Sequence, residues 1–152
     1  MSGLGLALVI VVSTVLGTLG ILALVFQLLR RLRGPAAREG AARVAQRYPG
    51  VAVRAMDPMA HFLGLESEGV WQVRGTGVLA LTDEALWFSM YFVGREIEVP
   101  RSAIRGVELV DSHLRKRVLG SKLLQVRYLR EGAEERVAWR VGDPAAWQAA
   151  LR

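Results

Sequence analysis

The first 29 residues of the chain contain no charged side chain. A helix over residues 4–29 would measure about 39 Å at 1.5 Å per residue, which exceeds the hydrocarbon core of a bilayer, roughly 30 Å thick. The only polar side chains in that stretch are Ser13, Thr14, Thr18 and Gln27. This segment constrains the fold more than any other, because it predicts a transmembrane helix over residues 1–29.

A cleaved secretory signal is the alternative. Such a signal has a basic start, an apolar run of about 7–15 residues and a small-x-small cleavage site. Here no Lys or Arg precedes the apolar run, which is too long and ends in QLLRRLR (residues 27–33) without an Ala-x-Ala pattern. The sequence therefore favours a retained anchor.

The arginines after the apolar segment predict its orientation. Residues 30–54 hold seven arginines and one acid, Glu39, and so carry the whole net charge of +6. The positive-inside rule then places the N-terminus outside the cell (inner or plasma) membrane and the rest of the chain in the cytoplasm. Since the excess charge is juxtamembrane, the high pI does not indicate nucleic-acid binding. Leaflet contact is expected for Arg30, Arg31, Arg33 and Arg38; alternatively, these arginines only fix topology and solvate a linker.

Residues 30–54 are expected to form a basic juxtamembrane linker. A short Ala/Arg-rich helix is predicted over residues 35–48, because Pro35 suits a first helical turn and Pro49-Gly50 is a stop signal. The chain has no cysteine, which excludes disulfides and thiolate metal sites and fits a reducing compartment.

From about residue 70 the apolar residues recur with a period of two, which is typical of strands with one buried face. Six or seven such strands follow at regular spacing with no helix between them, so an antiparallel sheet is expected. Residues 50–66 show no clear period. After Asp143-Pro144, an N-cap followed by proline, Trp147, Ala150 and Leu151 lie on one face of a short helix. The fold class is therefore mainly β with a C-terminal capping helix.

Several strings resemble bacterial PH-like (pleckstrin-homology-like) and GRAM-like domains. Residues 77–88 (GVLALTDEALWF) resemble the hairpin of these domains, and residues 96–104 (EIEVPRSAI) resemble a strand that ends in proline. Residues 123–141 resemble the last hairpin, and residues 143–147 the start of the capping helix. The resemblance implies a PH-like antiparallel β-barrel or sandwich over residues 55–152.

The resemblance implies a module that binds membrane surfaces, phosphoinositides or protein partners, and not an enzyme. Phosphoinositide-binding PH domains use several basic residues around the first hairpin, where this chain offers Arg74. The long connection between the strands that end at residue 110 and begin at residue 123 holds the other candidate residues, which are His113, Arg115, Lys116 and Arg117. They could engage lipid phosphates or a partner; the alternative is a solvated polar loop.

Other patterns indicate structure more than chemistry. Residues 75–80 match G-x-G-x-x-A, but a hairpin and not a helix follows, so a glycine-containing turn is expected. His61 and His113 lack the clustered ligands of a metal site, and the pairs Glu96/Glu98 and Glu134/Glu135 look like solvated edges. No catalytic, cofactor-binding or metal-binding residue is predicted.

The four tryptophans, at 71, 87, 139 and 147, are expected to fill the core and its margins. Trp87 and Tyr91 lie opposite the face of Leu86, Phe88, Met90 and Phe92, and could alternatively form an exposed patch for a partner. The function expected is a single-pass, membrane-anchored interaction module whose partner is the bilayer, an anionic lipid headgroup or a membrane protein. The alternative is a structural subunit of a membrane complex. The oligomeric state is left open.

Overall fold

The computed structural model describes residues 3–152, with side chains for residues 9–28 and 34–152. The chain divides into two compact units, one up to Pro35 and one from Ala36 onward. Helix α1 (Gly3–Arg47) contains the stretch Val9–Leu28, which is exposed and is long and apolar enough to cross a membrane. A signal sequence near an N-terminus has the same properties.

The hydroxyl side chains within this stretch bond to the backbone of their own helix. The Ser13 and Thr14 hydroxyls donate to the Ile10 carbonyl at 3.0 and 2.8 Å. Thr18 donates to the Thr14 carbonyl at 2.9 Å. These hydroxyls therefore need no external partner in an apolar solvent such as a bilayer.

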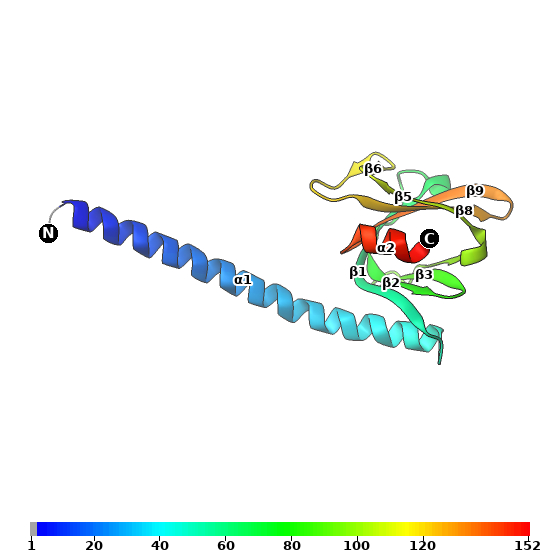
Figure 1. Ribbon diagram of the computed structural model, residues 1–152, viewed down its shortest axis with the longest axis horizontal. Helices are drawn as coiled ribbons and strands as arrows, with labels where there is room; N and C mark the ends of the chain where they lie inside the picture. Colours follow the sequence, from blue (N-terminus) through cyan, green and yellow to red (C-terminus); the bar gives the residue numbers. More distant parts are fainter. Residues whose placement is uncertain (1–2) are drawn as a thin grey trace. The chain divides into compact units, whose positions relative to one another are not determined.

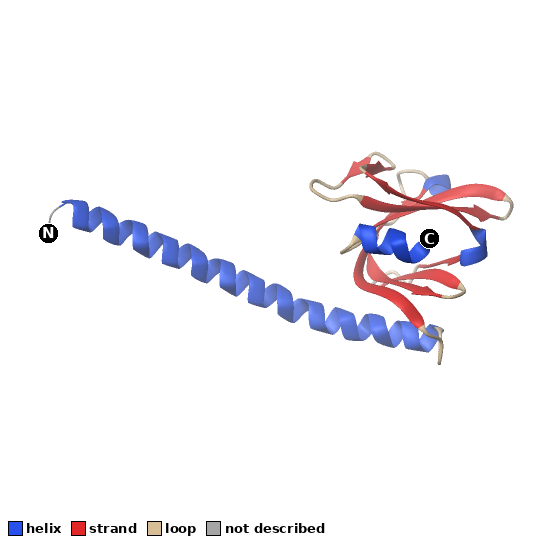
Figure 2. Ribbon diagram, viewed as in Figure 1, coloured by secondary structure: helices blue, strands red, loops and turns tan. Residues whose placement is uncertain are grey.

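The second unit is mainly β, as the period-two pattern predicts (Figure 2). Its long strands are β1 (Val53–Leu65), β2 (Gly75–Thr82), β3 (Ala85–Met90), β4 (Glu96–Pro100), β5 (Ile104–Val110), β8 (Leu123–Arg130) and β9 (Ala133–Arg140). They form one antiparallel sheet in the order β4-β3-β2-β1-β9-β8-β5 (Figure 1). Two short strands, β6 (Ser112–His113) and β7 (Lys116–Arg117), pair separately, and two 3-10 turns cover Glu66–Glu68 and Arg101–Ala103. The sheet is not closed, because β4 and β5 are both edges.

Strand β1 lies in the part of the chain without a clear period. Its first part pairs with β2 from Val53 to Phe62, and its last part pairs with β9 from His61 to Leu65. Register shifts interrupt both ladders, and such irregularities bend a strand and break its side-chain alternation. The bend lets one strand belong to both halves of the sheet.

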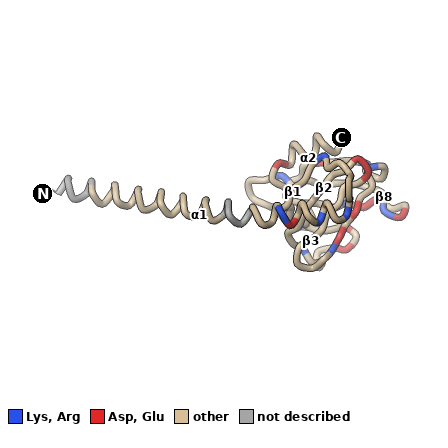
Figure 3. The backbone as a smooth tube through the Cα atoms, turned by 90° about the horizontal axis from the view of Figure 1, so that it is seen from below, with Lys and Arg blue, Asp and Glu red and all other residues tan. Residues whose placement is uncertain are grey.

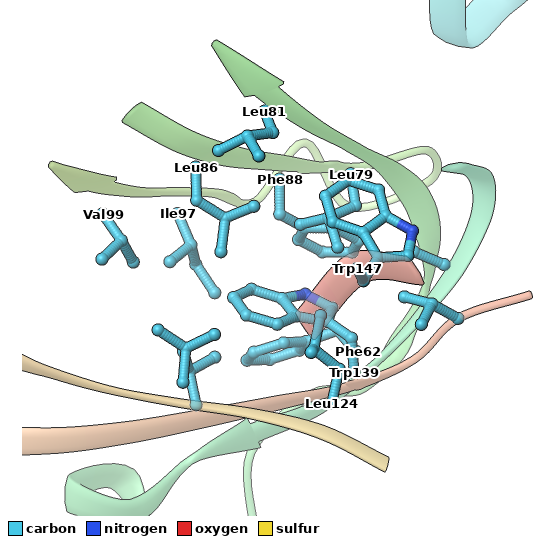
Figure 4. Packing of buried hydrophobic residues seen from close by; sticks show 14 of the residues in the cluster. Phe62, Leu79, Leu81, Leu86, Phe88, Ile97, Val99, Leu124, Trp139 and Trp147 are labelled. Carbon is cyan, nitrogen blue, oxygen red and sulfur yellow. The ribbon is translucent and has the colours of Figure 1, made fainter. Parts of the chain in front are cut away.

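The core fills the space between the two halves of the sheet (Figure 4). The Phe62 ring stacks on Phe88 with centroids 5.6 Å apart and lies 6.4 Å from that of Trp139. Helix α2 (Pro144–Leu151) contacts β1, β5 and β8 and contributes Trp147 to this core. The Asp143 side chain accepts from the Ala146 backbone N–H at 3.0 Å, so the predicted N-cap and capping helix are confirmed.

The outer face of β2 and β3 is covered by the last turns of α1. Val44 is buried against Val78, Ala80 and Trp87, and Tyr48 packs beside them. The helix predicted over residues 35–48 is present as the end of α1, and residues 36–54 belong to the compact unit of the sheet. The alternative prediction of an exposed patch at Trp87 is therefore wrong, because this segment leaves only 1% of the residue exposed.

The glycine pattern at residues 75–80 lies within β2, so the predicted turn is wrong. A Cβ on Gly77 would lie 2.1 Å from the Ser89 carbonyl oxygen of β3. Glycine is therefore needed there for close approach of two strands, and not for a positive φ.

Candidate functional site

The predicted basic connection contains a β-hairpin. Ser112 of β6 pairs with Arg117 of β7, and His113 pairs with Lys116. The two residues of the turn, Leu114 and Arg115, have φ values of +47° and +63°, as in the tight turns that join twisted strands. This turn gives the basic residues a defined backbone instead of an irregular loop.

His113 fixes the hairpin to the sheet. Its Nε2 lies 3.0 Å from the Gly64 carbonyl oxygen, which can only accept, so Nε2 carries the proton. Nδ1 then accepts from the Gln125 amide at 3.0 Å. Burial is the main cause that lowers the pKa of His113, with the positive charge of Arg74 as a smaller one. Both ring nitrogens are engaged, so His113 supports the hairpin and does not offer a donor to a ligand.

The three cations of the hairpin point into solvent. Arg115, Lys116 and Arg117 are exposed, and none forms an ion pair with a carboxylate among the described residues. At the base of the connection, Lys122 pairs with Asp111 at 2.7 Å. Near it, the side chain of Leu119 is 93% exposed. The hairpin thus presents a compact cationic tip with an apolar neighbour.

Arg74 differs from the cations of that tip in being half-buried. Its Nε donates to the Leu63 carbonyl oxygen at 2.5 Å, and its Nη2 is buried without a hydrogen-bond partner. Burial, then Arg140, then Arg74 lower the pKa of His61. Arg74 is therefore a half-buried side chain that bonds to β1 next to the imidazoles of His61 and His113, whereas residues 115–117 of the hairpin are exposed.

The juxtamembrane arginines differ from one another. Arg38 is exposed on α1, whereas the side chains of residues 30, 31 and 33 lie outside the described residues. Arg43 donates to the carbonyls of Met90 and Tyr91 at 3.2 and 3.0 Å and pairs with Glu39. Of these described arginines, only Arg38 is free to meet a headgroup, because Arg43 is bound to the end of β3.

One of the acids expected at a solvated edge is buried. Glu135 is 3% exposed and accepts from the Ser67 hydroxyl, from the Ser67 backbone N–H at 3.1 Å and from the Arg136 backbone N–H at 3.0 Å. Its role is structural, because it holds the start of the β1–β2 loop on β9. Glu98 stays exposed and pairs with Arg47 at 2.6 Å.

Two exposed aromatic residues were not recognised from the sequence. Trp71, in the β1–β2 loop, is 96% exposed, although a core position was expected. Phe92, in the β3–β4 turn, is 95% exposed, although the alternation of β3 placed it inward. Strand β3 ends at Met90, so the period cannot be extended to Phe92. Gly94 two residues later, with a φ of +65°, was the available signal of a turn.

A cleft of about 280 Å³ lies between the edge strand β4 and the end of β8. Its lining includes Leu65, Ile97 and Tyr128, rimmed by the ion pair Arg95–Glu68 at 2.6 Å. Within residues 3–152 as described, no three His, Cys, Asp or Glu side chains gather as metal ligands would.

Comparison with known protein families finds no match, and no curated protein is significantly similar to the chain.

Proposed function

We propose that the chain is a single-pass membrane anchor that carries a PH-like interaction module at the cytoplasmic face of the cell membrane. The observation that carries this proposal is the burial of Val44 in the outer face of the sheet. The segment that follows the apolar stretch is thereby part of the module. A module joined in this way stays close to the bilayer in which its helix is anchored.

The PH-like assignment rests on the strand order. Four consecutive strands form one half of the sheet, three form the other, and β1 belongs to both. The only helix after the strands, α2, lies between the two halves (Figures 1 and 2). An antiparallel sheet followed by one capping helix is what the resemblance implies for residues 55–152, and this order of elements supports the assignment.

The ligand class proposed is anionic: a lipid headgroup or an acidic surface of a membrane protein. The tip formed by Arg115, Lys116 and Arg117 supports it, because unpaired exposed cations gain energy near an anionic leaflet, about 1 kcal/mol each. Figure 3 shows the charged residues of the described chain gathered on the second unit. Removing the three arginines at 30, 31 and 33 from the net charge of +6 leaves +3 for residues 36–152.

The absence of cysteine makes anchoring and topology directly testable. Topology is tested by treating intact cells that carry a Ser2→Cys or an Ala52→Cys variant with a membrane-impermeant maleimide. We expect Ser2→Cys to be labelled in intact cells and Ala52→Cys only after lysis. Anchoring is tested by washing the membranes in alkaline carbonate, and we expect the chain to stay in the membrane. A chain shortened at its N-terminus and released by carbonate would show a cleaved signal and refute the proposal.

The alternative subunit role is tested by copurification. A membrane protein recovered in stoichiometric amount with the full chain in mild detergent would favour an assembly subunit. Retention of that protein by the Arg115/Lys116/Arg117→Ala variant would exclude the basic hairpin as its binding site.

A further inference from the structure

Two loops of the second unit each present one aromatic side chain almost entirely to solvent. Trp71 lies in the β1–β2 loop and Phe92 in the β3–β4 turn. Val73 and Val93, their near neighbours in sequence, are 54% and 58% exposed. Burying an exposed aromatic ring removes 150–250 Å² of surface from water, so water is an unfavourable environment for all four side chains.

The two loops are joined at one end of the first half of the sheet. The Tyr91 backbone N–H donates to the Thr76 carbonyl at 3.1 Å. Arg95 pairs with Glu68 at 2.6 Å. The two aromatic residues therefore belong to a single rim, which we call the aromatic rim: residues 69–74 and 91–94.

Of the three acids nearest the rim in sequence, two form ion pairs, and the third, the exposed Glu96, accepts a hydrogen bond from Trp87 Nε1 at 3.4 Å. Glu68 is paired with Arg95, and Glu66 lies 3.7 Å from Arg136. No Asp or Glu lies within the rim itself. A negatively charged surface would thus meet no unpaired carboxylate on these segments.

The rim also lies where the chain enters the second unit. The Tyr91 hydroxyl donates to the carbonyls of Ala36 and Pro58 at 3.2 and 2.5 Å, which fixes the β3–β4 turn beside the first residue of that unit. Eight residues lead from Leu28, the end of the apolar stretch, to Ala36. Even fully extended they span at most about 29 Å, so this segment tethers Ala36, to which the β3–β4 turn is bonded, within that distance of the apolar stretch.

From these observations we infer that the aromatic rim docks into the headgroup region of the bilayer, with Trp71 and Phe92 as its anchors. Trp in particular favours the boundary between lipid and water. The exposed Arg38, two residues after Ala36, adds a cation at the same end. This inference rests on the proposed membrane anchoring and specifies which surface of the module contacts lipid.

Tryptophan fluorescence can test the inference in the intact protein, because Trp87, Trp139 and Trp147 are all buried. The full chain is reconstituted in phosphatidylcholine–phosphatidylglycerol vesicles, with or without bromine on the acyl chains near the headgroup. We expect brominated lipid to quench part of the emission of the parent chain and lipid to shield that part from aqueous iodide. The Trp71→Phe variant should lose both effects and keep the emission of the buried rings.

Further variants in the Trp71→Phe background test the second loop. Phe92→Trp should restore quenching by brominated lipid. Val51→Trp is the matched control, because residue 51 lies just before the start of β1, at the end of the strand opposite the rim. The tryptophan at residue 51 should remain accessible to iodide and should not be quenched by brominated lipid.

Three results would overturn the inference. The first is a Trp71 that iodide reaches as freely in vesicles as in detergent. The second is a Trp71 that is shielded from iodide but is not quenched by brominated lipid. If this shielding increases with the protein-to-lipid ratio, a second copy of the chain covers the rim. The third is loss of the chain from floated vesicles, which would refute the membrane anchoring itself; the first two results leave anchoring intact.

Discussion

Tyr48 packs edge-on against Trp87, with ring centroids 6.0 Å apart and ring planes at 87°. The Tyr48 hydroxyl also donates to Glu98 at 2.7 Å, and Arg47 donates to the same carboxylate oxygen at 2.6 Å. Burial, followed by the hydrogen bond to Glu98, raises the pKa of Tyr48, so the hydroxyl remains a donor at neutral pH. The end of α1 is thus joined to β3 and β4 by an aromatic contact and by a charged network.

Replacing Trp87 by Ala should lower the free energy of unfolding by about 3–5 kcal/mol, because it leaves a cavity under Val44 and Tyr48. Protease sensitivity of residues 36–52 should rise as the end of α1 separates from the sheet. Trp71→Ala is the matched control, since a fully exposed tryptophan should change stability by less than about 0.5 kcal/mol. Guanidinium unfolding of the full chain in detergent measures both, and equal effects would contradict the packing described.

The buried carboxylate of Glu135 gives a second prediction. Glu135→Gln should cost about 1–3 kcal/mol, because the donors of Ser67 and Arg136 lose a charged acceptor in a buried site. Glu134→Gln is the control; its side chain is 45% exposed and pairs with Arg127 and Arg136, so at most about 1 kcal/mol is expected. Thermal unfolding followed by near-UV circular dichroism distinguishes the two, and an unchanged Glu135→Gln variant would exclude the structural role.

Regular patterns in the sequence predicted the long strands from β2 onward and helix α2, but not the short strands β6 and β7. Alternation identifies residues 123–141 as a hairpin because both of its strands have one face in the core. The alternation fails at β1, because register shifts and the positive φ of Gly64 change which face of the sheet successive side chains occupy. A bent strand shared by two halves of a sheet cannot show a single period.

The environment of particular side chains depended on contacts distant in sequence. The alternation along β3 places Trp87 on the face opposite the core. The residue is buried only because residues 44–48, at the end of α1, pack on that face. Glu135 has the same alternation as the buried Val137 and Trp139, which places it inward and Glu134 outward; the Ser67 donors that bond to its carboxylate come from a segment distant in sequence. Conversely, Phe92 is exposed because the strand ends two residues before it.

Gly77→Ala should prevent β2 and β3 from pairing normally. The added Cβ would lie 2.1 Å from the Ser89 carbonyl oxygen, a backbone atom that cannot move without breaking the ladder. A loss of at least about 3 kcal/mol is expected, in the range of severe backbone and packing defects. Gly142→Ala is the control, because its Cβ would make an ordinary contact of 3.6 Å with Asp57. Soluble yield and unfolding midpoints of the two variants provide the comparison.

Stability should decrease as the pH falls below about 6.5, the ordinary value for histidine. Burial lowers the pKa of His61 and of His113 in the folded state, so the unfolded chain binds protons in a range where the folded chain does not. Proton uptake then favours unfolding, and the stabilising contribution is complete only above about 6.5. Unfolding curves between pH 5 and pH 8 measure this slope. A stability that rises on acidification in this range would contradict the neutral imidazoles described.

The basic hairpin supplies the last prediction, and the structure decides which fragment can test it. A fragment that begins at residue 50 would expose Val78, Ala80 and Trp87, so residues 36–152 are the unit to use. Arg115/Lys116/Arg117→Ala should weaken its binding to vesicles containing phosphatidylglycerol, with each lost arginine or lysine worth about 1 kcal/mol at low salt. Arg105/Arg140/Arg152→Ala removes the same charge from exposed positions elsewhere, and it should reduce binding less. Equal losses for the two triple variants, measured by vesicle flotation, would show that net charge and not the hairpin determines binding.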